Sequence, residues 1–160
     1  MSIGAAPTVR IRVLRLMEPQ MTVFSTNALI DRTDESPAAF ATRWLPPSTA
    51  VISARGEIDA VNAADFADYA LRNTTKAERV AVDLTDVEFF GTAGFSALMA
   101  IEVRCSAANI DWTLVPSKAV ARLLRVCDPD SALRTCYSVA AALSSLNGKT
   151  SLLQLVTKSR

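Results

Sequence analysis

The most informative absence in this sequence of 160 residues is histidine, which does not occur at all. Without an imidazole, Ser-His-Asp triads, Cys-His dyads, histidine-bearing zinc sites and histidine pH switches are excluded. The 5 glycines form no GxGxxG, GxxxxGK or GxSxG motif, so the dinucleotide, phosphate-loop and serine-hydrolase signatures are missing as well. A hydrolase that uses Thr92 or a cysteine is disfavoured, and we expect no enzyme, cofactor or metal centre.

Cysteines and long apolar runs are also scarce. Cys105, Cys127 and Cys136 are odd in number and lack CxxC spacing, which fits neither a disulfide framework nor a four-ligand metal site. Buried structural thiols are the favoured interpretation, and a redox-sensing pair is the alternative. No run approaches the ~18 apolar residues that span a bilayer. Arginines interrupt the apolar N-terminal residues, unlike in a secretory signal, so the sequence predicts a cytoplasmic protein without a membrane partner.

Neither sign of charge is in excess. The 17 basic and 16 acidic residues give a net charge of +1, whereas nucleic-acid binders usually carry a strong basic excess. Half of the residues are hydrophobic, which is enough for the core of one domain at this length. We expect an N-terminal extension or linker at 1–36, one domain at 37–147 and a tail at 148–160, with Met21 as an alternative start.

The apolar patterns of residues 38–146 predict alternating strands and helices. The order ββαβαβαβα, with helices between strands, predicts an α/β sandwich. Helices are expected to begin near Asn62, Thr92 and Ser117, and the last to span 139–146. The expected strands are 38–45, 50–55, 79–84, 112–115 and 133–137.

Two glycine-marked segments are candidates for a functional surface, one at 56–59 and one at 89–94. We expect Thr92 to be an exposed N-cap residue. A phosphate on its hydroxyl would meet the unpaired amides and the positive end of the helix dipole, so the fold would tolerate the modification. A purely structural cap is the alternative.

Aromatic and acidic residues surround these segments. Phe89, Phe90 and Phe95 are expected to be core in part, although one exposed aromatic would make a good binding hot spot. Carboxylates at strand ends are more often turn formers and caps than magnesium ligands, and we favour the structural role over a magnesium site. The carboxylates concerned are those of Asp59, Asp83, Asp86 and Glu88.

Three stretches carry a resemblance to a known family: Gly56-Glu57-Ile58-Asp59, Val80 to Gly94 (VAVDLTDVEFFGTAG) and Val115 to Leu124 (VPSKAVARLL). In this order the sequence resembles the STAS domains, in particular the bacterial anti-sigma-factor antagonists, over about residues 38–146. The resemblance implies a small mixed β-sheet of about four to five strands with helices packed mainly on one face.

The resemblance also implies a function. Such a protein binds a kinase-type anti-sigma factor and frees a sigma factor for transcription, and phosphorylation of the antagonist at the position of Thr92 releases it. Ala93 stands where a second hydroxyl occurs in the family, and Gly91 stands in place of an aspartate. A non-phosphorylated scaffold or a small-ligand-sensing module is the alternative, and self-association into a homodimer is left open. The expected partner-binding residues are Glu57, Asp59, Phe90, Gly91, Thr92, Ala93, Gly94 and Phe95.

Overall fold

The structure is a computed structural model that describes residues 38–158, with side chains described as far as residue 148. A helix follows each of the last three strands, which confirms the predicted α/β class. The predicted extension at 1–36, including Met21, lies outside the described residues. The elements are β1 (Ala38–Leu45), β2 (Thr49–Ile58), α3 (Ala63–Thr74), β3 (Arg79–Phe90), α4 (Thr92–Ala107), β4 (Asp111–Pro116), α5 (Lys118–Cys127) and α6 (Val139–Lys158).

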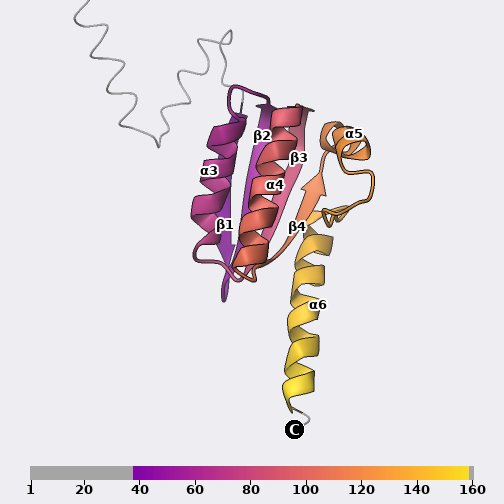
Figure 1. The fold of residues 1–160 in the computed structure, drawn as a ribbon. Coiled ribbons are helices and arrows are strands. Elements are labelled where there is room, and N and C mark those ends of the chain that lie inside the picture. Colours follow the sequence, from indigo (N-terminus) through magenta and orange to yellow (C-terminus); the bar gives the residue numbers. More distant parts are fainter. Residues whose placement is uncertain (1–37, 159–160) are drawn as a thin grey trace, which may run out of the picture. The chain divides into compact units, whose positions relative to one another are not determined.

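The four strands form one mixed sheet in the order β1-β2-β3-β4 (Figure 1). β1 and β2 form an antiparallel hairpin closed by the prolines and serine at 46–48, whereas β3 and β4 each pair parallel with the preceding strand. Parallel neighbours need a crossover, and α3 and α4 provide these connections. The mixed sheet implied by the family resemblance is therefore confirmed.

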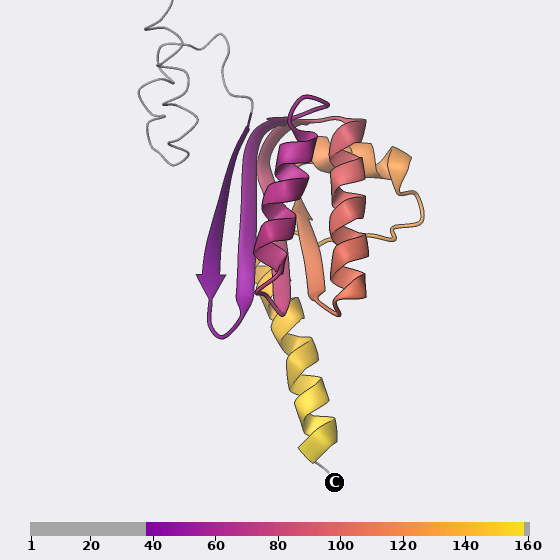
Figure 2. The ribbon, with the colours of Figure 1, turned by 60° about the vertical axis from the view of Figure 1, so that its left-hand side comes forward.

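The main core lies between the sheet and the helices α3, α4 and α5. Alternate residues of β2 and β3 face these helices, so that Ile52, Val82 and Leu84 are fully buried against Phe66 and Leu98. Figure 2 shows α3 and α4 side by side over this face of the sheet. Their packing holds the first turn of α4 over the end of β3.

A smaller core occupies the opposite face. Val51, Ala81 and Val115 point away from α3 and α4, and the first half of α6 covers them with Ala142 and Leu146. Three helices therefore pack on one face and a single helix on the other. This arrangement agrees with the predicted packing mainly on one face.

Four predicted elements differ from the structure. The strand predicted at 50–55 is β2, which runs from Thr49 to Ile58. β3 runs to Phe90 and not to Leu84, because two register shifts against β2 interrupt the alternation of apolar residues. The predicted strand 133–137 is reduced to a single parallel bridge between Leu114 and Thr135. α6 ends at Lys158 and not near residue 146, so it crosses the predicted boundary between domain and tail.

Candidate functional site

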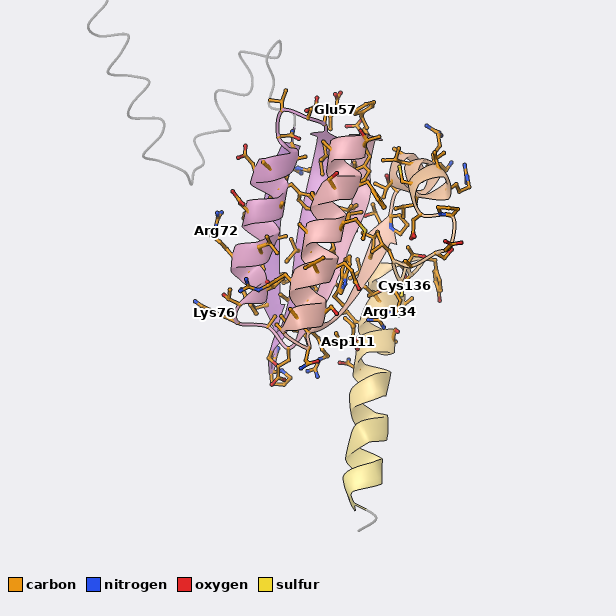
Figure 3. All side chains as sticks on the ribbon, viewed as in Figure 1. Glu57, Arg72, Lys76, Asp111, Arg134 and Cys136 are labelled. Atoms are coloured by element: carbon orange, nitrogen blue, oxygen red, sulfur yellow. The ribbon has the colours of Figure 1, made fainter. Side chains whose placement is uncertain are left out.

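The two glycine-marked segments meet at one end of the sheet. β2 and β3 run parallel to their last residues, which places Glu57 beside Phe89 and Ile58 beside Phe90. The Gly91 N–H donates to the Ile58 carbonyl at 2.9 Å and joins the two strand ends. Figure 3 labels Glu57 at the end of the sheet where α4 begins. We call this end, formed by residues 57–62 and 88–95, the docking edge.

The turn between β2 and α3 is held by its own polar groups. The Asp59 carboxylate accepts from the Val61 N–H at 2.9 Å, and the Asp59 N–H donates to the Asn62 side-chain oxygen at 3.0 Å. Asn62 also donates from its side-chain nitrogen to the Glu57 carbonyl at 2.9 Å. Asn62 is the predicted N-cap of α3, yet its side chain makes no capping bond because it is engaged in this turn. The turn is thereby fixed, with Val61 standing out from it.

The start of α4 corrects the predicted role of Thr92. Gly91 is the N-cap, with extended backbone angles (φ −92, ψ 176), and Thr92 is the first residue of the helix. The Thr92 side chain is exposed, and its hydroxyl has no hydrogen-bond partner among the described residues. Because the cap residue is a glycine, no side-chain oxygen occupies the helix end next to this hydroxyl. The predicted exposure of Thr92 is correct, and its predicted capping role is wrong.

The expected partner-binding residues fall into two sets by burial. Glu57 and Thr92 are exposed, whereas Asp59, Gly91, Ala93 and Phe95 are partly exposed. Phe90 and Gly94 are buried, so these two residues are not placed to contact a partner directly, contrary to the prediction. A Cβ atom on Gly94 would lie 2.6 Å from the Phe90 ring, which shows that the two residues form the packed base of the docking edge.

The structure adds two apolar side chains to the docking edge. Phe89 is 51% exposed and Val61 is 83% exposed, one on each of the joined segments. Phe89 is the exposed aromatic that the sequence left undecided among three phenylalanines. The exposure of Val61 was not predicted from the sequence. The available signal was its position between Asp59 and the helix cap Asn62, where no strand or helix face can bury it.

The charge of the docking edge is acidic. Glu57 and Glu88 are exposed, Asp59 is partly exposed, and neither segment contains lysine or arginine. Exposed apolar groups rimmed by polar residues are typical of a surface that meets another protein. The alternative of a magnesium site gains nothing, because no three acidic, cysteine or histidine residues are grouped to hold a metal within the described part of the chain.

None of the three cysteines belongs to the docking edge, and all three are free. Cys105 is buried in α4, where burial first and the Glu102 carboxylate second raise the pKa of its thiol to about 11. Cys127 and Cys136 are partly exposed. Of the helices in residues 38–158, none has the length and apolar character needed to span a membrane.

The strand order and the helix placement define the class of small α/β domains with one mixed sheet. Residues 45–142 match the STAS domain family, and the chain belongs to this family. The resemblance found in the sequence motifs is thereby confirmed.

Named relatives place the family in context. The chain is 34% identical over 101 residues to the anti-sigma-F factor antagonist RsfA of Mycobacterium tuberculosis, an overlap of 61% of this chain and 79% of that protein. It is 35% identical over 74 residues to osmosensory protein A of Mycobacterium tuberculosis, with 46% of this chain and 47% of that protein covered. The chain thus spans about half the length of that second relative.

A solved structure agrees in fold. The crystal structure of an anti-sigma factor antagonist from Mycobacterium paratuberculosis matches with a TM-score of 0.63 at 20% identity. The match covers 69% of this chain and 94% of the other. At this identity the likeness shows the fold alone.

Proposed function

We propose that this protein is an anti-sigma factor antagonist that binds a kinase-type anti-sigma factor through the docking edge and so frees a sigma factor. It acts by binding and performs no turnover of its own. The observation that carries the proposal is the unpartnered Thr92 hydroxyl, exposed at the start of α4 on an edge that also exposes Phe89 and Val61. The named antagonist relative and the antagonist fold support the same function.

Phosphorylation of Thr92 is proposed as the switch. A phosphate there lies at the N-terminal end of α4, where the helix dipole favours negative charge, so the fold tolerates it. The modification adds about −1.5 to −2 charge in the middle of the contact. A partner that covers Phe89 and Val61 must then desolvate this charge, which weakens binding. A loss of about 2.7 kcal/mol, or a hundredfold in Kd, is enough for a switch.

The test measures modification and binding with the candidate anti-sigma kinase. With ATP, the full chain is expected to take up phosphate at Thr92, and Thr92→Val is expected to take up none while binding normally. Thr92→Glu is expected to bind about a hundredfold more weakly. Thr75→Glu is the matched control, since Thr75 is also exposed and is the C-cap residue of α3. Equal labelling of the full chain and Thr92→Val would reject the switch.

A second candidate function keeps the docking edge and omits the switch. Gly91 and Ala93 flank Thr92, and neither carries the polar side chain that the family pattern has there. This observation favours a non-phosphorylated scaffold or a small-ligand-sensing module. Under this function Thr92→Glu leaves partner binding unchanged, whereas Phe89→Ala weakens it. Under the first function both substitutions weaken binding.

A further inference from the structure

The outer edge of β1 has no paired strand within residues 38–158. β1 is the first strand in the sheet order and pairs only with β2 among the described residues. Figure 2 shows it as the outermost strand, with α3 set back from it over the sheet. Its outward N–H and C=O groups therefore form a free template for another strand.

β1 lacks most of the features by which monomeric proteins protect such an edge. It has eight residues in an unbroken register with β2, from Ala38↔Gly56 to Leu45↔Thr49, without a bulge. It contains no proline, and Arg43 is its single charged residue. Trp44, which would be costly to expose, is 44% exposed beside Arg43. Long, regular edges of this kind pair with other strands.

A second copy of β1 fits this edge in a defined register. In an antiparallel pair, two directly opposed residues either both point their N–H and C=O groups toward the partner strand or both point them away from it. Two identical strands can therefore pair only with the two-fold axis through a residue and not between two residues. An axis through Arg43 would oppose two guanidinium groups. An axis through Ala41 instead places Trp44 beside Ala38 of the second copy and Arg43 beside its Ala39. The large side chain then covers a small one, and no like charges meet.

α3, the helix nearest to β1, is charged in a way that suits the same axis. Tyr69 of α3 accepts a hydrogen bond from Thr42, and its ring lies 5.6 Å from that of Phe40, so it sits level with Ala41. At ~1.5 Å per residue, Asp65 lies about 6 Å on one side of this level and Arg72 about 5 Å on the other.

A two-fold axis perpendicular to the sheet keeps both copies of α3 on one face and runs them antiparallel. The acidic start of one α3 then faces the basic end of the other. Figure 3 shows Arg72 and Lys76 directed away from the domain on the outer side of α3. Opposite charges therefore meet where the two helices approach.

We propose that the protein forms a homodimer by antiparallel pairing of β1 with β1 of a second copy about an axis at Ala41. The two sheets join into one continuous sheet. The docking edges lie at opposite ends of this sheet because the strands of the two copies run in opposite directions. Each copy therefore keeps its docking edge free, and the proposal stands whether or not that edge binds an anti-sigma factor.

The test is sedimentation equilibrium of the full chain at micromolar concentration. The expected mass is twice the 17.2 kDa of one chain. Ala41→Glu opposes two carboxylates on the axis and is expected to weaken the dimer by up to about fivefold. Ala107→Glu is the matched control, because Ala107 is exposed at the end of α4, and it is expected to behave as the unmodified chain.

A charge exchange provides a second measurement that leaves the strand intact. Asp65→Arg is expected to weaken the dimer, and adding Arg72→Asp is expected to restore it, because the pair of opposite charges is re-formed across the axis. Thermal melts by circular dichroism establish that each variant is folded.

Two results overturn the proposal. One is a dimer whose strength is the same with and without Ala41→Glu. The other is a chain that stays monomeric up to several hundred micromolar. If such a monomer also protects the outward amides of β1 from hydrogen exchange, the occupant of the edge is a segment of the same chain.

Discussion

Replacement of Gly94 by alanine is predicted to lower the free energy of unfolding. A Cβ atom at this position would lie 2.6, 2.7 and 3.0 Å from three carbons of the Phe90 ring. The ring cannot swing away, because Phe90 is only 5% exposed and packs in the main core. Overpacking of a filled core costs about 1–3 kcal/mol. Alanine recovers about 1 kcal/mol of helix propensity. The net expected loss for Gly94→Ala is up to about 2 kcal/mol.

The assay is urea unfolding followed by tryptophan fluorescence, since Trp112 is 5% exposed and reports on the core. Gly148→Ala is the matched control: it is also helical, but nothing lies within 4 Å of its Cβ position. It is expected to be neutral or to stabilise by up to about 1 kcal/mol. Gly94→Ala combined with Phe90→Leu is expected to recover part of the loss. If Gly94→Ala gains stability as Gly148→Ala does, the argument from the ring contact is refuted.

Two further predictions concern α5 and α4. The Ser117 hydroxyl caps α5 by accepting from the Val120 N–H at 3.2 Å, so Ser117→Ala is expected to cost about 1 kcal/mol in urea unfolding and Ser117→Asp to cost less. The buried Cys105 thiol has its pKa raised from 9.0 to about 11, so between these values the unfolded chain loses its proton first and stability falls as pH rises. Cys105→Ala is expected to flatten this part of the stability curve, and an unchanged slope would contradict the assignment.

The sequence was sufficient for the elements whose apolar residues repeat without interruption. β1 has the predicted bounds, and α3 and α4 begin where polar or glycine residues precede a helical stripe. The end of β3 was not predictable from alternation, because the register shifts beside Arg55 and Gly56 change which residues face the core. The polar residues Thr85, Asp86 and Glu88 then have the pattern of a loop although they lie in a strand. The bridge at Thr135 depends on β4 being present beside it, which no local pattern encodes.

The position of the docking edge was predictable from the sequence, but the identity of its exposed residues was not. Motif order brought the segments at 56–59 and 89–94 to attention, and parallel strands place their ends together. Simple alternation fails within this segment because each register shift adds one residue to β3, so the buried parity changes at Val87 and returns at Phe90. Phe90 therefore turns into the core and Phe89 turns out.

The same register shifts explain why the docking edge has its present composition. Without them, the alternation of β3 would carry on from Leu84 and bury Asp86 and Glu88 on the helix face. With the shifts, Val87 takes a buried position and the carboxylates of Asp86 and Glu88 stay in solvent. Gly56, with its positive φ of 95°, stands at the second shift, a conformation that costs glycine little and other residues more. The strand irregularity marked by Gly56 therefore brings Val87 into the core and keeps the carboxylates of Asp86 and Glu88 in solvent next to the docking edge.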